Sequence, residues 1–196
     1  MTAAAGSPRY DIATVFPTAS DYFYFPHLVD STAMNNEFTF SGWLYRDYTD
    51  ATTRDFYYGL CNLYLTSSFK LGAAWQHATA DLSQNASNAW APTASPVIAE
   101  KTWTHIAFVF DNGVVRYYVN GGETKLTNSR VDTGTFIRGT KGYPNGSIGY
   151  KWIGKMSDVR TYATALTDNQ IKELYNTSML VDASGNVSPR ELGDLI

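Results

Sequence analysis

Residues 103–122 show the clearest alternation of side chains in the chain, and they predict a β-hairpin. The alternation gives two sets: Thr104, Ile106, Phe108 and Phe110 on one face, and Trp103, His105, Ala107, Val109 and Asp111 on the other. A period of two is typical of a pleated strand. Asp111-Asn112-Gly113 tolerates the positive φ of a tight turn, and residues 114–119 predict the return strand. Because both faces are fairly apolar, we expect one to pack on a second sheet and the other to be partly covered.

Two further stretches alternate in the same way. In residues 38–45, one face carries Phe38, Phe40, Gly42 and Leu44, and the other carries Thr39, Ser41, Trp43 and Tyr45. In residues 153–162, one face carries Met156, Asp158, Arg160 and Tyr162. Shorter strands are predicted at residues 10–15 (a sheet edge), 22–26, 56–60, 62–66, 68–75, 123–127, 135–138 and 147–150. The pattern therefore predicts an all-β domain.

Residues 77–96 are rich in Ala, Ser, Asn and Thr and have no sustained period, so they predict a long surface loop. A loop of this length is usually functional or mobile. Trp90 lies within it, and an indole is costly to leave in water.

The C-terminal part of the chain predicts one short amphipathic helix followed by a tail. Thr167 and Gln170 form a capping box, and Ile171, Leu174 and Tyr175 follow at helical spacing. Residues 180–187 predict a turn between extended pieces, and residues 188–191 form a second capping box with proline at its first helical position. The chain ends on an apolar set, Leu192, Leu195 and Ile196, which is either a frayed terminus or an arm that docks on a neighbouring subunit.

Composition limits the classes of function. The 196 residues carry a net charge of −3, with 17% charged and 44% hydrophobic residues, and Lys and Arg do not cluster. A nucleic-acid site would need a basic stripe, so we do not expect one. No apolar run is long enough for a membrane helix, and no signal peptide is visible at the N-terminus. The single cysteine, Cys61, excludes an intrachain disulfide and is expected in the core.

Several motifs together resemble the laminin-G-like domains of the concanavalin A-like lectin/glucanase superfamily. They are Phe38-Thr39-Phe40-Ser41-Gly42-Trp43-Leu44, Trp103-x-His105-x-Ala107 with Tyr118-Val119-Asn120-Gly121, and Gly154-x-Met156-x-Asp158-Val159-Arg160-x-Tyr162 before the helix. The resemblance implies a jelly-roll sandwich of two antiparallel sheets with one short C-terminal helix. It divides the chain into a lead-in (1–20), the jelly roll (21–176) and a tail (177–196). It implies less about function, since this fold hosts lectins, adhesion modules, hydrolases and structural domains.

Catalytic residues are not evident. Glucanases of the superfamily carry Glu-x-Asp-x-x-Glu on one strand, and no such run exists here; Glu37, Glu100, Glu123 and Glu173 are isolated. The three histidines show no metal-ligand spacing, and His105 is expected as a hydrogen-bonded core residue. The sequence predicts a protein that is not an enzyme.

Two candidate sites remain, each with a structural alternative. Aromatic and hydrogen-bonding residues that suit a carbohydrate are Trp75, His77, Trp90, Arg116 and Tyr118. The structural alternative is that Trp75 and Tyr118 pack in the core and that Trp90 holds its own loop in place. Carboxylates that suit calcium, the one cofactor considered, are Asp47, Asp50, Asp55 and Asp111, although a solvated loop and a hairpin turn also account for them.

These observations lead to two hypotheses of function. The first is a non-catalytic module that forms a surface or accessory component, of decoration or fibre type, in a larger assembly such as a virion, with other protein subunits as partners. The second is a free-standing lectin that binds a glycan. A degenerate glycosidase is a remote third.

Overall fold

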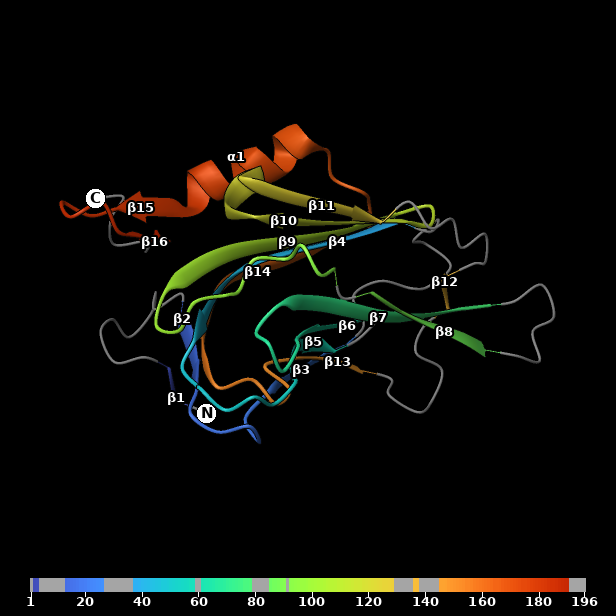
Figure 1. The fold of residues 1–196 in the computed structure, drawn as a ribbon, viewed down its shortest axis with the longest axis horizontal. Coiled ribbons are helices and arrows are strands. Elements are labelled where there is room, and N and C mark those ends of the chain that lie inside the picture. Colours follow the sequence, from blue (N-terminus) through green and yellow to red (C-terminus); the bar gives the residue numbers. More distant parts are fainter. Residues whose placement is uncertain are drawn as a thin grey trace.

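Two antiparallel sheets face each other in the computed structural model, which describes residues 2–3, 13–26, 37–58, 61–78, 85–90, 92–128, 136–137 and 145–190 (Figure 1). Sheet A has the order β1 (Thr2–Ala3), β2 (Ala13–Phe16), β14 (Gly154–Tyr162), β4 (Glu37–Arg46), β9 (Trp103–Asp111), β10 (Val114–Val119) and β11 (Thr124–Asn128). Sheet B has the order β12 (Phe136–Ile137), β7 (Leu71–Ala78), β6 (Cys61–Leu65), β5 (Arg54–Tyr58), β13 (Asn145–Ile148) and β3 (Phe23–Pro26), and β8 (Asn85–Trp90) pairs with β7.

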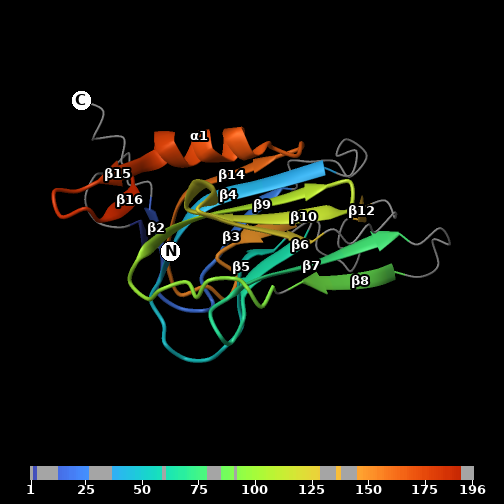
Figure 2. The same ribbon diagram turned by 45° about the horizontal axis from the view of Figure 1, so that its top comes forward.

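One α-helix and a small hairpin complete the described part of the chain. The helix α1 (Asp168–Ser178) lies on the side of sheet A that faces away from sheet B, and Figure 2 shows the same arrangement from a second angle. The strands β15 (Met179–Val181) and β16 (Val187–Pro189) pair beyond the end of α1, and a single 3-10 turn, η1 (Asn120–Gly122), follows β10. This architecture is the all-β sandwich with one short C-terminal helix that the sequence predicts. Among the described residues, no helix has the length and apolar character needed to cross a bilayer.

The central hairpin forms as the alternation predicts. Asp111 pairs with Val114, and the two turn residues between them, Asn112 and Gly113, have φ values of 47° and 91°. Both values lie in the left-handed region, which a primed hairpin turn requires and which Asn and Gly tolerate best. The turn therefore fixes the register of β9 against β10.

The main core lies between the sheets and is dominated by aromatic rings. Phe40 of sheet A packs against Phe56 of sheet B with ring centroids 5.7 Å apart. The Tyr117 hydroxyl, on sheet A, donates a hydrogen bond of 2.7 Å to the backbone carbonyl of Gly72 on sheet B. Burying each such ring contributes about 1.5–3 kcal/mol relative to leaving it exposed. Cys61 is buried in this core, as predicted.

Helix α1 covers the second face of sheet A. Its capping box is present: the Gln170 amide donates to Thr167 Oγ1, and Gln170 Oε1 accepts from the Thr167 amide. Ile171 is fully buried between the helix and the sheet, in a cluster with Ala107 and Val109 of β9 and with Tyr118 and Leu166. Sheet A is therefore buried on both faces in its centre.

His105 is a hydrogen-bonded core residue, as the sequence predicts. Its Nε2 lies 3.0 Å from Ser41 Oγ, and its ring packs against both Trp43 and Tyr175, which also stack on each other. Burial lowers the pKa of His105 to about 3, so the ring is neutral at physiological pH. The Trp43 indole in turn donates to Ser178 Oγ at 3.0 Å, which ties the end of α1 to the sheet.

The prediction of one long loop over residues 77–96 is wrong. Strand β7 continues to Ala78, and β8 runs back along it from Asn85, opposite Ala78, to Trp90, opposite Ala73. The small polar residues of β8 have weak strand propensity, but a neighbouring strand supplies the hydrogen bonds that hold them extended. Local pattern alone does not contain that pairing.

Strand β14 contains a β-bulge between Ser157 and Arg160, where two residues oppose one on β4. Met156, before the bulge, is buried in the main core, whereas Tyr162, after it, packs in the cluster beneath α1. The predicted common face for Met156, Asp158, Arg160 and Tyr162 is therefore wrong, because one extra residue reverses the alternation.

Two smaller predictions are also corrected. Residues 10–15 were expected to form a sheet edge, but β2 pairs with β14 on one side and with β1 on the other. The capping-box pattern at residues 188–191 does not begin a helix at Ser188 and Pro189, which lie in β16, paired with β15. Pairing with β15 overrides the local helix signal there. The turn between extended pieces is confirmed by this hairpin.

We predict that Ile171→Ala lowers the free energy of unfolding by about 2–4 kcal/mol, because it leaves a cavity between α1 and sheet A. Urea denaturation followed by tryptophan fluorescence measures this change. Lys172→Ala, on the exposed side of the same helix, is the matched control and should change stability by less than about 0.5 kcal/mol. Equal losses in the two variants would contradict the packing described for the helix.

Candidate functional site

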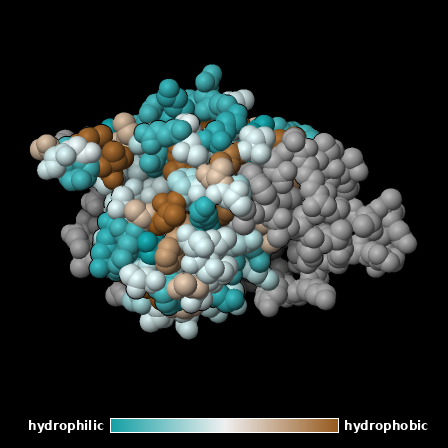
Figure 3. Space-filling model, viewed as in Figure 1, coloured by the Kyte–Doolittle hydropathy of each residue, from teal (hydrophilic) through white to brown (hydrophobic). Residues whose placement is uncertain are grey.

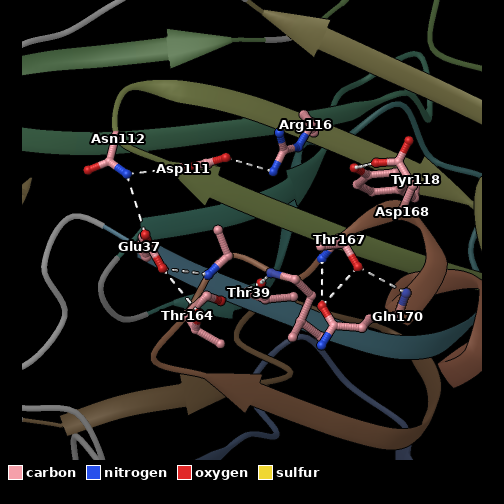
Figure 4. A network of polar contacts seen from close by, with 12 residues as sticks. Glu37, Thr39, Asp111, Asn112, Arg116, Tyr118, Thr164, Thr167, Asp168 and Gln170 are labelled. Atoms are coloured by element: carbon pink, nitrogen blue, oxygen red, sulfur yellow. Dashed lines mark hydrogen bonds and ion pairs between the residues drawn. The ribbon is translucent and has the colours of Figure 1, made fainter.

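A surface pocket of about 380 Å³ lies where the β9–β10 hairpin meets the start of α1. The residues around it come from β9, β10, the start of α1 and the loop before the helix: Asp111, Arg116, Ala165, Leu166, Thr167, Asp168 and Asn169. Figure 4 shows the polar contacts that hold several of these side chains. The pocket is polar on the side of the hairpin and of the helix start.

Arg116 reaches the pocket from β10. It pairs with Val109 across the hairpin, so its side chain lies on the helix-covered face of sheet A. Its Nη2 donates to Asp111 Oδ2 at 3.0 Å, and its buried Nε has no acceptor in the described part of the chain. The ion pair holds the planar guanidinium in one orientation at the wall of the pocket.

Asp168, the first residue of α1, is held from two sides. Its Oδ1 accepts the Tyr118 hydroxyl at 2.8 Å, and its Oδ2 pairs with Lys125 Nζ at 2.5 Å. The hydrogen bond from Lys125, followed by that from Tyr118, lowers the pKa of Asp168. Burial, followed by donation to Asp168, raises the pKa of Tyr118. Asp168 is therefore a fixed, ionised acceptor at a helix N-terminus, where negative charge is favourable.

Glu37 and Thr39 of β4 hold the loop before α1, whose residues 165–167 line the pocket (Figure 4). Glu37 Oε2 accepts from Thr164 Oγ1 at 3.1 Å and from the Ala165 amide at 3.2 Å. Thr39 Oγ1 donates to the Thr164 carbonyl and accepts from the Leu166 amide. Sequence reasoning missed both residues, because their partners lie 125 to 128 positions away and no local pattern links them.

The arrangement offers hydrogen-bonding groups of both kinds in fixed positions. Arg116 supplies donors, Asp168 supplies an ionised acceptor, and the Asn169 side chain can supply both. A ligand with neighbouring hydroxyl groups can donate to the carboxylate and accept from the guanidinium at the same time. The two carboxylates of the pocket are occupied by cationic partners, which does not suit the role of a proton donor.

The structure brings together only part of the predicted carbohydrate set. Arg116 lines the pocket, whereas Tyr118 is only 1% exposed and is connected to the pocket through its hydrogen bond to Asp168. Trp75 and His77 lie on β7 and Trp90 on β8, which belong to sheet B. The five residues therefore do not form one site. Leu192, Leu195 and Ile196 lie outside the described residues.

The structure does not gather the four predicted calcium ligands into one group. Asp50 and Asp111 are engaged by Arg54 and Arg116 at 2.7 and 3.0 Å, and Asp47 lies 4.0 Å from Lys101 Nζ. Asp55 lies apart from Asp111, on β5 of sheet B. Within the described ranges, no group of three or more His, Cys, Asp or Glu residues could hold a metal ion.

Sheet B presents a second polar surface on the side away from the core. Leu63 and Leu65 of β6 point into the core, so Asn62 and Tyr64 point outward, opposite Tyr58 and Asp55 of β5. All four of these outward residues are half-buried. Burial raises the pKa of Asp55 to about 6, and nearby Lys151 opposes the shift.

The fold defines the class of this protein as a sandwich of two antiparallel sheets with one covering helix. Residues 17–172 match the family model described as the concanavalin A-like lectin/glucanases superfamily, of laminin-G type. The chain belongs to this family, as its motifs predict.

Solved structures that share this fold include the following three. Domain 4 of AbnA, a GH43 extracellular arabinanase from Geobacillus stearothermophilus in complex with arabinotriose, is 23% identical, with a TM-score of 0.55 over 83% of this chain and 76% of that one. A heptameric SAP-like pentraxin from Limulus polyphemus is 15% identical, with a TM-score of 0.51 over 83% and 81%. The binding domain of botulinum neurotoxin DC in complex with SialylT is 14% identical, with a TM-score of 0.52 over 84% of this chain and 42% of that one. At these identities the likeness shows the fold.

We predict that Asp55→Asn stabilises the protein at pH 8 by roughly 2 kcal/mol and leaves it unchanged near pH 3.5. The folded-state pKa of Asp55, about 6, lies above the unfolded value of 3.8. The folded state therefore binds the proton more tightly. The free energy of unfolding falls as the pH rises from the unfolded pKa of 3.8 to the folded pKa of about 6. Above that range, Asp55 is charged in the folded state and the full cost of burying the charge is present. Thermal melts across pH 3.5 to 8 measure the effect.

Asp50→Asn is the control, because Arg54 lowers the pKa of Asp50 and the sign is reversed. That variant should be slightly less stable than the parent at pH 8. A gain from Asp55→Asn that is the same at both ends of the pH range would exclude charge burial as its cause.

Proposed function

We propose that this domain is a non-catalytic carbohydrate-binding module whose ligand occupies the pocket beside α1. The observation that carries the proposal is that one pocket is lined by both a guanidinium, Arg116, held by Asp111, and a carboxylate, Asp168, held by Tyr118. A few convergent polar groups in a concave surface are the usual form of a small-molecule site. Groups held in place beforehand bind at a lower cost in entropy.

Known structures of the same fold support the class of ligand. The arabinanase domain, 76% of which matches this chain, was solved in complex with arabinotriose, and the neurotoxin binding domain, 42% of which matches, was solved in complex with SialylT. The pocket contains no carboxyl group free of a cationic partner, which supports binding without hydrolysis. Sugar hydroxyls match its donors and acceptors, whereas an extended apolar ligand would leave them unpaired.

We predict that Asn169→Ala and Arg116→Gln each weaken glycan binding at least about 10-fold, the cost of one or two lost hydrogen bonds to a charged or polar group. Affinity gel electrophoresis in arabinan, in β-glucans and in a sialylated glycoprotein first identifies the ligand class for the parent protein. The same gels then measure the variants. Asn176→Ala, at an exposed position farther along α1, is the control and should bind like the parent.

Retention of full binding by both pocket variants would contradict the pocket assignment. Loss of binding in Tyr64→Ala, with the pocket variants unaffected, would move the ligand to the outer face of sheet B. A parent protein that binds no glycan would contradict the proposed function as a whole.

A second candidate function is that of a subunit in a larger assembly, of decoration or fibre type. The β15–β16 hairpin projects from one end of the sandwich (Figure 1), and Figure 3 shows apolar surface there beside the polar surface over α1. Val181, on this hairpin, is 52% exposed. A pentraxin that shares this fold is heptameric, which supports the possibility of an oligomer. A virion as the host assembly remains a prediction from the sequence.

If this second candidate holds, Val181→Asp should convert an oligomer into a monomer without changing the melting temperature by more than about 2 °C. Size-exclusion chromatography with light scattering reads out the change, and Ser184→Asp at the exposed turn is the matched control. A monomer for the parent protein at all concentrations would argue against self-assembly through this hairpin.

A further inference from the structure

Three buried hydrogen-bond donors at one end of the sandwich have no acceptor among the residues that the structure describes. They are the Tyr48 hydroxyl, Arg54 Nε and the Trp152 indole Nε1. The residues that carry them are 6%, 7% and 0% exposed, respectively. Buried donors in folded proteins almost always have a partner, because an unpaired one costs about 1–3 kcal/mol. Three such donors together therefore indicate that a bound group supplies the acceptor.

The three side chains form one contiguous cluster. The Tyr48 ring packs edge-on against Trp152, with centroids 5.7 Å apart and planes at 89°. The Arg54 guanidinium carbon lies 4.7 Å from the Tyr48 ring centroid. Arg54 Nη1 also donates to the carbonyl of Lys151, the residue before Trp152. The cluster thus joins the loop after β4 to the turn before β14.

The same cluster carries more positive than negative charge. Arg46, 5% exposed, lies with its guanidinium carbon 5.4 Å from the Tyr48 ring centroid and 4.0 Å from that of Phe69. Its hydrogen bonds go to the carbonyls of Ile98 and Tyr48, and no carboxylate among the described residues pairs with it.

Among the described residues, Arg54 has one carboxylate partner, Asp50, whose side chain is 56% exposed. Two buried guanidinium groups beside one ring are therefore balanced by one carboxylate at the surface. An uncompensated buried charge is costly, and aromatic faces offset only part of that cost.

We propose that this cluster binds a small monovalent anion of the size of chloride, held by Tyr48, Arg54 and Trp152. A water molecule could accept one or two of these hydrogen bonds but would leave the excess charge in place. An anion accepts several hydrogen bonds and neutralises the second guanidinium. The proposal is independent of the carbohydrate pocket, which involves none of these residues.

The first test compares thermal stability in sodium chloride and in sodium gluconate at equal ionic strength. Gluconate is too large for a packed site, so only chloride should stabilise the folded protein by linkage. We expect the melting temperature to be higher in chloride by at least about 3 °C and to rise with its concentration. Equal melting temperatures in the two salts would overturn the proposal.

The second test uses Tyr48→Phe and Trp152→Phe, which remove one donor each and keep an aromatic ring. In gluconate, Tyr48→Phe should be as stable as the parent or more stable, because an unpaired buried hydroxyl is lost. In chloride, both variants should lose at least half of the chloride-dependent rise. Tyr64→Phe, outside the cluster, is the control and should keep the full rise.

A third measurement needs no variant. Crystals of the parent protein grown in sodium bromide should show an anomalous-scattering peak in contact with Trp152 Nε1 or Arg54 Nε. A water molecule there, without an anomalous peak, would overturn the proposal.

Discussion

Burial of sheet A on both faces is the constraint on which the rest of the structure depends. Strand β9 is buried from its second residue to its last but one, with one set of side chains in the main core and the other beneath α1. Both faces of such a strand are apolar and must be shielded from water. Sheet B covers one face, and helix α1 covers the other. The helix in turn brings Asp168 next to Arg116, so the pocket is a consequence of covering the second face.

Signals that are local in sequence predicted most of the architecture. The Asn112-Gly113 turn, the alternation in β9 and the Thr167 capping box each fix an element within a few residues, and each formed where expected. The errors have one physical origin. Strand β8, the bulge in β14 and the strand at Pro189 all depend on a partner elsewhere in the chain, which overrides weak local preferences.

The candidate site was predictable only in part for the same reason. Arg116 and Tyr118 were identified because they sit two residues apart on one face of a strand. Glu37 and Thr39 could not be identified, because they act on a loop more than a hundred residues away. The aspartates proposed for calcium were chosen by residue type, but the structure gives two of them arginine partners, and sequence spacing could not reveal those contacts.

The hydrogen bond from the Tyr117 hydroxyl to the Gly72 carbonyl has a mechanical consequence. Two apolar layers could slide past each other at little expense, since hydrophobic contact has no preferred direction. A directional hydrogen bond across the interior resists that sliding, because a small displacement would leave a buried hydroxyl without a hydrogen-bond partner. This hydrogen bond therefore fixes the position of sheet A relative to sheet B along the direction of the strands.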